Sequence, residues 1–308
     1  MVEMSIVSIP HIHQNQMTFP RVAVIILNWN GIDDTSECLQ SLKELNYPVY
    51  DVIVVDNGSA GEDVKVLKNC YSDYIHLIQN RENKGFAEGN NIGIRYALAK
   101  LNPDYLVILN NDTIVAPDFL YELVKVAQSD TTIGIIGPKI YYYNFQQRDN
   151  VIWFAGGRIR WWRWVRVYTA QGQNRHDQAR YQAIRCVDWV AGSAMMIGRH
   201  VVDESLFLNP RYFFGLEDIE YCLRAQKRGF KVVYVPDAIV WHKVNRARKK
   251  YDPSFADLSS YYYFLKQNFS NWVYIYHLAE LPIILAYWTL VYLLKRRDKK
   301  HWVFSGVI

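Results

Sequence analysis

Three consecutive polar residues at the end of an apolar run are the strongest candidates for chemistry in this chain. Residues 106–109 are apolar and typical of a buried strand, and Asn110, Asn111 and Asp112 follow directly. In open α/β sheets ligands bind at the carboxyl ends of the strands, so these side chains would lie at a binding edge. One carboxylate flanked by two amides suits a hard divalent cation that keeps water or phosphate oxygens as its other ligands. A plain turn is the alternative, because Asn and Asp favour turns.

Two earlier apolar runs end in the same way. Residues 22–27 and 52–55 are continuous apolar stretches, and they are followed by Asn28 and Asp56. Strands that alternate with helical patterns predict a parallel sheet with right-handed crossovers. The three polar strand ends would then gather at one edge, which favours a nucleotide pocket there. Neither a Gly-x-Gly-x-x-Gly motif nor a P-loop lysine follows the first strand, and this argues against ordinary dinucleotide and P-loop sites.

The size permits one large domain, or one domain with an appendage. The chain has 308 residues, of which 50% are hydrophobic, so a sizeable core is possible. Its four cysteines form no CxxC pair and no metal-ligand spacing, which suits a reducing cytoplasm. The first 16 residues lack the apolar stretch of a secretory signal. The net charge is +5, and dense basic runs at residues 243–250 and 295–300 are of the kind that meets phosphates, nucleic acid or anionic lipid.

Seven motifs in order resemble those of the GT-A glycosyltransferases of family 2, and most of all the rhamnosyltransferase-like members. They lie at residues 22–30, 54–59, 83–93, 109–112, 189–193, 214–220 and 241–242. The resemblance covers residues 20–245 and implies an α/β fold of the GT-A type, the Rossmann-like fold of nucleotide-diphospho-sugar transferases. In this fold a mostly parallel central sheet is flanked by helices, and here a C-terminal helical extension would follow it. The chain is expected to divide into an N-terminal arm (1–20), the GT-A domain that the resemblance implies (21–250) and a C-terminal helical, membrane-associating segment (251–308).

The resemblance implies an inverting glycosyltransferase of bacterial polysaccharide or glycolipid synthesis. Such enzymes move a sugar from a nucleotide diphosphate sugar to an acceptor hydroxyl, here with dTDP-rhamnose as the candidate donor and a glycan or lipid-linked glycan as acceptor. The hydroxyl must lose its proton as it attacks, and a well-placed carboxylate can take that proton. By resemblance Asp218 is this general base, and Glu217 positions the acceptor or the base. The alternative is that both acids merely complement a helix N-terminus.

The resemblance also implies where the donor and the metal bind. The residues expected to bind the nucleotide sugar lie at strand ends and in a polar loop before a helix: Asn28, Asn30, Asp56, Asn57, Lys84, Gly85, Asn90 and Asn111. Asp56 would accept a hydrogen bond from a pyrimidine base, and the loop would favour phosphate at the helix N-terminus. The residues expected to wall the sugar and the acceptor are Trp189, Gly192 and Ser193.

The expected metal ligands are Asp112, His242 and Asn110, which would hold Mg²⁺ or Mn²⁺. Asn110 stands where the family often has the first aspartate of an Asp-x-Asp motif. Asp112 is therefore the only carboxylate of that run, and His242 matters more here than it would beside two aspartates.

The C-terminal segment is expected to associate with a membrane. Residues 272–294 are mostly apolar, but the cleaner run 281–294 is shorter than the roughly 20 residues of a spanning helix. We expect an interfacial helix or a re-entrant hairpin bent at Pro282, with the basic run at 295–300 on anionic lipid, which makes a peripheral or monotopic protein on the cytoplasmic face. A packing or dimerisation helix is the alternative. The basic and aromatic run 158–166 would meet an acceptor or a membrane rather than nucleic acid.

Two other functions stay open. A nucleotidyltransferase also uses a pyrimidine pocket and a metal, but an early Gly-rich, basic loop after the first strand is missing. A noncatalytic scaffold that binds carbohydrate or nucleotide sugar would tolerate Asn110. The acids Asp112, Glu217 and Asp218, together with His242, argue for catalysis instead.

Overall fold

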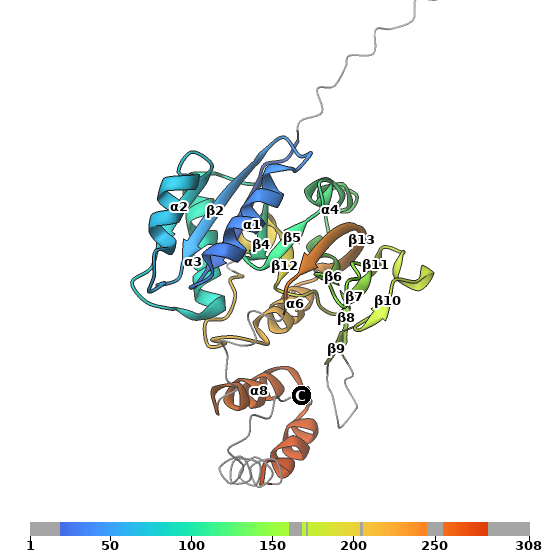
Figure 1. Cartoon of the computed structure of the whole chain (residues 1–308). Helices are drawn as coiled ribbons and strands as arrows, with labels where there is room; N and C mark the ends of the chain where they lie inside the picture. Colours follow the sequence, from blue (N-terminus) through green and yellow to red (C-terminus); the bar gives the residue numbers. More distant parts are fainter. Residues whose placement is uncertain (1–18, 160–167, 171, 204–205, 245–254, 283–308) are drawn as a thin grey trace, which may run out of the picture.

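A computed structural model describes residues 19–159, 168–170, 172–203, 206–244 and 255–282. The expectations for residues 1–18, for most of the run 158–166, for the basic residues beyond 244 and for the tail beyond 282 lie outside these ranges. In the described part, helices surround a central 11-stranded sheet, and a C-terminal helical region lies beyond one end of it (Figure 1). No helix among these residues is long and apolar enough to span a membrane.

The first half of the sheet is the α/β unit that the sequence predicts. β1 (Val22–Asn28), β2 (Tyr50–Asp56), β3 (Ile75–Gln79) and β4 (Tyr105–Asn110) are parallel, in the order β4-β1-β2-β3. The helices that connect them are α1 (Ile32–Lys43), α2 (Asp63–Tyr71) and α3 (Gly85–Lys100). The apolar residues of β1 and β4 are almost wholly buried, and each buried Val, Ile or Leu stabilises the fold by roughly 1.5–3 kcal/mol.

Two glycines let α3 pack closely on β1. A Cβ atom at Gly93 would lie 2.5 Å from a methyl group of Ile25, and one at Gly89 would lie 2.5 Å from Leu27. The helix begins at Gly85, so the part of the expected polar loop from residue 85 onward is helical. Gly and Asn have low helix propensity, so the sequence predicts a loop there, and this prediction was wrong. Close packing of the helix on the sheet outweighs the low propensity.

The second half makes the sheet mixed. β12 (Ala194–Gly198) enters antiparallel between β4 and β6 (Ile133–Tyr142), so the parallel pairing expected from the alternation ends there. β13 (Lys231–His242) runs parallel to β6 and antiparallel to β5 (Thr113–Val115). A register shift between Val235 and Ile239 absorbs the interruption at Pro236. The sequence predicts a turn after that proline, but the strand continues to His242.

The remaining elements complete the periphery. The short strands are β7 (Val151–Phe154), β8 (Gly157–Ile159), β9 (Tyr168–Ala170), β10 (Arg175–His176) and β11 (Arg185–Cys186), and a 3-10 helix spans Ala179–Tyr181. The helices are α4 (Phe119–Ala127), α5 (Arg199–Asp203), α6 (Glu217–Lys227) and α8 (Phe255–Asn268). Residues 187–197 have the apolar pattern of one strand, but only Ala194–Gly198 forms β12, and Trp189 makes an isolated β-bridge to Gly157.

α8 packs against α6 (Figure 1). Phe264 and Leu265 of α8 are fully buried, and the Lys227 ammonium donates to Asn268 Oδ1 over 3.1 Å. A further helical stretch at residues 271–282 is tied to α8 by a hydrogen bond of 2.6 Å from the Tyr262 hydroxyl to the carbonyl of His277. The C-terminal region is therefore attached to the helix that begins with the two candidate catalytic acids.

Candidate active site

The polar strand ends meet at one edge of the sheet, as the sequence predicts. Asn28 of β1 lies opposite Asp56 of β2, and Asn110 of β4 lies opposite Leu27, one residue earlier. Because β2, β1 and β4 are parallel neighbours, these three ends lie side by side at the carboxyl edge, where α/β sheets bind ligands.

Asn28 and Asp56 form a buried hydrogen-bond network with an aspartate that the sequence patterns did not single out. The Asn28 amide donates to Asp56 Oδ2 over 2.8 Å and to Asp63 Oδ2 over 3.0 Å. Asp63 Oδ2 also accepts the Gly31 N–H, and Asp56 Oδ1 accepts the Ser59 N–H over 3.1 Å. Both carboxylates therefore hold turns of the β1–β2 edge in place. Asp63 was missed because it reads as an ordinary acid in the first turn of α2.

The other expected donor residues on this edge also organise loops. Asn111 donates to Thr35 Oγ1 over 3.0 Å, and a Cβ atom at Gly31 would lie 2.6 Å from its amide nitrogen. Asn57 is buried, accepts the Lys84 N–H over 3.1 Å and donates to the Gly85 carbonyl over 3.2 Å. These bonds join the end of β2 to the start of α3.

Asn30 and Lys84 stay on the surface of this edge. Asn30 is exposed, with a left-handed φ of 49°, and its side chain accepts the Ala60 N–H over 2.8 Å. Lys84 immediately precedes α3, and its ammonium pairs with Glu82. Both side chains can therefore be reached by a ligand from solvent.

The N-terminus of α3 is bonded within the protein. Gly85 N–H donates to Asn83 Oδ1 over 2.8 Å, and Phe86 N–H donates to the Phe213 carbonyl over 2.7 Å. The sequence predicts that N–H groups at this helix N-terminus bind phosphate, and two of them are already hydrogen-bonded within the protein. Asn90, expected in the loop, lies inside α3 and is fully buried, with its amide donating to the Phe86 carbonyl over 2.9 Å.

Asp112 and His242 form a buried pair. His242 Nε2 lies 3.0 Å from Asp112 Oδ1, although 130 residues separate them in the chain. Burial acts to raise the pKa of Asp112, but the charge and hydrogen bond of His242 outweigh it, so the pKa of this carboxyl is lowered. In the described part of the chain, Asp112 Oδ2 and His242 Nδ1 are buried without a hydrogen-bond partner. The pair therefore holds unused ligand atoms.

The donor set of this pair fits a divalent cation. A carboxylate oxygen and an imidazole nitrogen are ligands that Mg²⁺ and Mn²⁺ accept, and Asp112 Oδ2 and His242 Nδ1 are the atoms of the pair without a partner in the described residues. Asn110 ends β4 two residues before Asp112. Within the described ranges no three His, Cys, Asp or Glu side chains converge on one point. The protein part of the site therefore suits an ion that takes most of its ligands from water and diphosphate.

Two residues that the sequence patterns did not select lie next to His242. The Trp153 ring meets the imidazole edge-on, with centroids 4.6 Å apart. Lys243 is buried, and its ammonium donates to Asp34 over 3.3 Å and to Glu37 over 2.6 Å. In the sequence Lys243 reads as the first member of a basic run, and its burial appears only in the structure.

Glu217 and Asp218 begin α6, and two left-handed residues lead into them. Gly215 has a φ of 88° and Leu216 a φ of 73°, a conformation that costs a leucine roughly 1–2 kcal/mol. Burial raises the pKa of both acids, and the charge of Asp218 raises the pKa of Glu217 further. Glu217 Oε2 has no partner within the described residues. A strained turn thus places two carboxyls where burial disfavours the ionised form of both, and where the charge of Asp218 further disfavours ionisation of Glu217.

Gly192 and Ser193 connect the acid pair to the metal-side residues. Gly192 N–H donates to Asp218 Oδ2 over 2.9 Å, and the Ser193 carbonyl accepts the Asn110 N–H over 2.9 Å. A Cβ atom at Gly192 would lie 3.3 Å from Asp218 Cβ, so the loop approaches the acid closely. Trp189, expected on a strand, lies in this loop, and its buried ring packs 4.8 Å from Phe154.

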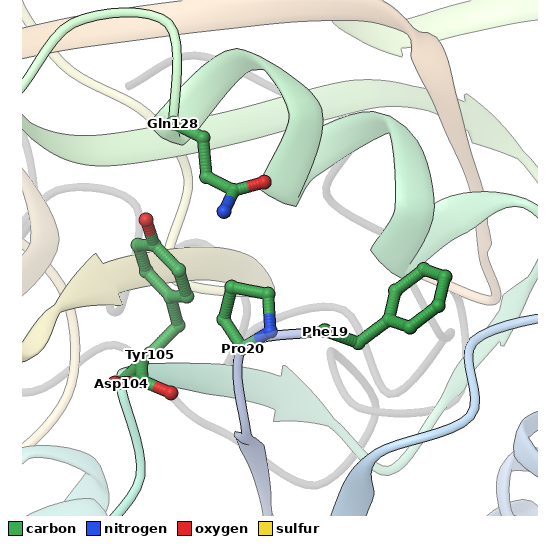
Figure 2. Close-up of a pocket in the computed structure, with 5 residues that line it drawn as sticks. All are labelled: Phe19, Pro20, Asp104, Tyr105 and Gln128. Carbon is green, nitrogen blue, oxygen red and sulfur yellow. The ribbon is translucent and has the colours of Figure 1, made fainter. Parts of the chain in front are cut away.

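A separate hollow lies at the opposite edge of the sheet. It has a volume of about 380 Å³ and lies between Pro20, before β1, and Tyr105, the first residue of β4; Asp104 and Gln128 also line it (Figure 2). Because it is at the amino ends of these strands, it is not part of the candidate site.

The chain is similar to known glycosyltransferases over most of its length. The model of a family described as glycosyltransferase-like family 2 matches residues 20–256. The low-salt glycan biosynthesis hexosyltransferase Agl10 of Haloferax volcanii is 30% identical over 229 residues, or 74% of this chain and 69% of the relative. The N-acetylglucosaminyl-diphospho-decaprenol L-rhamnosyltransferase of Mycobacterium tuberculosis is 25% identical over 243 residues, or 72% of this chain and 76% of the relative.

One solved structure shares the fold over most of both chains. The mannosyltransferase PcManGT from Pyrobaculum calidifontis, in complex with GDP-Man and Mn²⁺, aligns with a TM-score of 0.54 at 18% identity. The alignment covers 88% of this chain and 76% of that one. This likeness supports the α/β fold class that the sequence predicts.

Proposed function

Because this chain belongs to the glycosyltransferase-like family 2, and is therefore a glycosyltransferase, we propose that it is an inverting enzyme with Asp218 as its general base. One observation carries this proposal. Gly192 and Ser193, adjacent in the chain, bond to Asp218 and to Asn110, so Asp218 and the end of β4, two residues before Asp112, border the same loop. A sugar between them would have a base on one side and the diphosphate-binding residues on the other.

Asp218 acts on the acceptor. It takes the proton of the acceptor hydroxyl while the hydroxyl oxygen bonds to the anomeric carbon, and the bond from that carbon to the diphosphate oxygen breaks on the opposite face. The N–H groups of Gly192 and Ile219 hold the two carboxylate oxygens at 2.9 and 2.8 Å, which fixes the direction of the free lone pairs. The raised pKa brings Asp218 closer to the strength of an effective base at neutral pH.

Asp112 and His242, with Asn110 beside them, would hold Mg²⁺ or Mn²⁺. When bound, this ion neutralises the negative charge that develops on the departing nucleotide diphosphate. The nucleotide lies at the β1–β2 edge, where Asn30 and Lys84 are accessible and where Asp56 keeps lone pairs for a base. Asp56 is fully buried, so a base reaches it only after the turn around Ser59 opens.

We propose a rhamnose donor and a lipid-linked acceptor, in line with the names of the relatives. A membrane position agrees with the helical stretch at residues 271–282, where Trp272, Ile275 and Leu278 are 78%, 53% and 43% exposed. Their spacing of three residues places them on neighbouring parts of one helix side, and an aromatic, apolar side of this kind suits a membrane interface.

The proposal is tested by transfer assays on the purified full chain. A panel of UDP-, GDP- and dTDP-sugars is incubated with Mn²⁺ or Mg²⁺ and an N-acetylglucosaminyl diphosphate lipid. We expect one donor to react, and NMR of the product to show an anomeric configuration opposite to that of the donor. Retention of configuration would remove Asp218 as the base of a single displacement. Metal-independent binding of a nucleotide sugar without turnover would favour a noncatalytic scaffold.

A further inference from the structure

A groove lies between α8 and the loop that leads into the acid pair, residues 209–216. It has a volume of about 320 Å³. The side chains that give it its character are two cations and three aromatic rings: Arg211, Lys266, Tyr262, Tyr263 and Tyr274. A serine and a glutamine complete the lining, and none of the lining residues is acidic.

The two cations are available to a ligand. Arg211 and Lys266 are both exposed, and within the described residues neither forms an ion pair with a carboxylate. The Arg211 guanidinium lies 4.0 Å from the centroid of the Tyr263 ring, which fixes its plane but leaves its N–H donors unused by any carboxylate. Two positive groups in one groove without an acid favour an anion, and a guanidinium is well matched to the paired oxygens of phosphate.

The groove is attached to the catalytic acids. Tyr263 also packs against Tyr212, with ring centroids 5.7 Å apart, and Tyr212 is fully buried. From Arg211 to Glu217 the chain advances six residues, which span at most about 20 Å. α8 packs on α6, the helix that begins at Glu217. The groove therefore lies near the acid pair and is built from different elements than the donor edge of β1, β2 and β4.

We propose that this groove binds a phosphate ester group on the acceptor side of the reaction, with Arg211 and Lys266 as its anion ligands. The inference rests on the proposed function for the reaction that it serves. Two sources share this chemistry: the diphosphate that links an acceptor sugar to its lipid, and the headgroup of an anionic phospholipid. Either would hold the acceptor end of the enzyme at a membrane, and the diphosphate would also place the sugar hydroxyl relative to Asp218.

The test compares R211Q and K266Q with K100Q, whose lysine is also exposed but lies at the end of α3. Calorimetry in EDTA measures binding of geranyl diphosphate and of inorganic pyrophosphate. Cosedimentation measures binding to phosphatidylglycerol vesicles that contain no acceptor. We expect each groove variant to weaken binding roughly tenfold, as loss of a partly exposed charged hydrogen bond does, and the control to bind as wild type.

The pattern of losses identifies the source. Weaker geranyl diphosphate binding in R211Q and K266Q supports the acceptor diphosphate, and a loss confined to vesicles supports the phospholipid headgroup. Equal binding by all variants to every probe overturns the inference. Because these measurements need no donor and no turnover, they stay informative if the panel shows no sugar transfer, and in that case only the proposed function fails. With an active donor, we expect a higher KM for the lipid acceptor and an unchanged KM for the donor.

Discussion

Replacing Asp218 with asparagine removes the proposed general base and keeps the shape of the side chain. Both oxygens of Asp218 accept backbone N–H groups, from Gly192 at 2.9 Å and from Ile219 at 2.8 Å. Asparagine has one oxygen, so its NH₂ group must face one of these donors and one hydrogen bond is lost. A hydrogen bond to a charged group contributes about 1.5–3 kcal/mol. Because loss of the charge also relieves Glu217, we expect the free energy of unfolding to fall by at most about 2 kcal/mol.

The same substitution should act far more strongly on catalysis. Loss of a general base lowers kcat by about 10²–10⁴-fold. The KM for the donor should change by less than roughly threefold, because Asp218 makes no bond to the β1–β2 edge and an interaction made only in the transition state acts on kcat. Initial rates of nucleotide diphosphate release measure both constants, and urea unfolding of the same preparation measures the stability.

Asp203→Asn is the matched control. Asp203 is an exposed aspartate on α5 that pairs with Arg199 over 3.3 Å. Its substitution should leave kcat unchanged and change the unfolding free energy by less than about 1 kcal/mol, as exposed ion pairs do. If folded Asp218→Asn protein keeps more than about a tenth of the wild-type kcat, Asp218 is not the base, since a general base contributes at least about 10²-fold.

Four further outcomes follow from the site. His242→Asn should weaken Mn²⁺ binding at least about tenfold in calorimetry, and unchanged affinity would show that this imidazole is not a ligand. Gly85→Ala should lower the unfolding free energy by about 2 kcal/mol, because φ is 79° and the new Cβ would lie 2.6 Å from a backbone oxygen. Gly61→Ala is the control, since a Cβ atom there meets only ordinary contacts. Equal urea midpoints for the two variants would contradict this expectation. Since folding raises the pKa of Glu217 and Asp218, their contribution to stability is present below the unfolded pKa of about 4 and is lost as pH rises through the folded pKa values. Activity should rise over that same pH window. A rate profile with its acid limb at pH 4 or below would refute the raised pKa values. EDTA should abolish transfer and added Mn²⁺ or Mg²⁺ should restore it, and full activity in EDTA would exclude a metal role.

The first four strands could be predicted from the sequence because local signals agree there. Each is an apolar run that is too short for a helix, and β1, β2 and β4 each end at a polar residue. Parallel pairing then brings Asn28, Asp56 and Asn110 together without further information, because right-handed crossovers leave few arrangements of neighbouring parallel strands.

The rest of the site depends on pairings that a local pattern does not contain. β13 looks interrupted at Pro236, and pairing with β6 and β5, both about 100 residues or more earlier, carries the strand on to His242. Trp189 has the apolar neighbours of a strand residue, yet it makes only an isolated β-bridge, to Gly157, and β12 begins at Ala194. The burial of Asp63 and Lys243 depends on partners 30 to about 200 residues away, and a charged residue at a helix start or in a basic run carries no sign of this.

The bond from Asn110 N–H to the Ser193 carbonyl extends the ladder between β4 and β12, a strand that pairs on both sides in the interior of the sheet. Amides in such a position exchange their hydrogen with solvent only when the domain unfolds as a whole. We therefore expect the loop that contacts Asp218 and the end of β4 before Asp112 to open together, as one cooperative unit. We expect motions that admit substrate or release product to come instead from the turns at the β1–β2 edge and from the loop before α6.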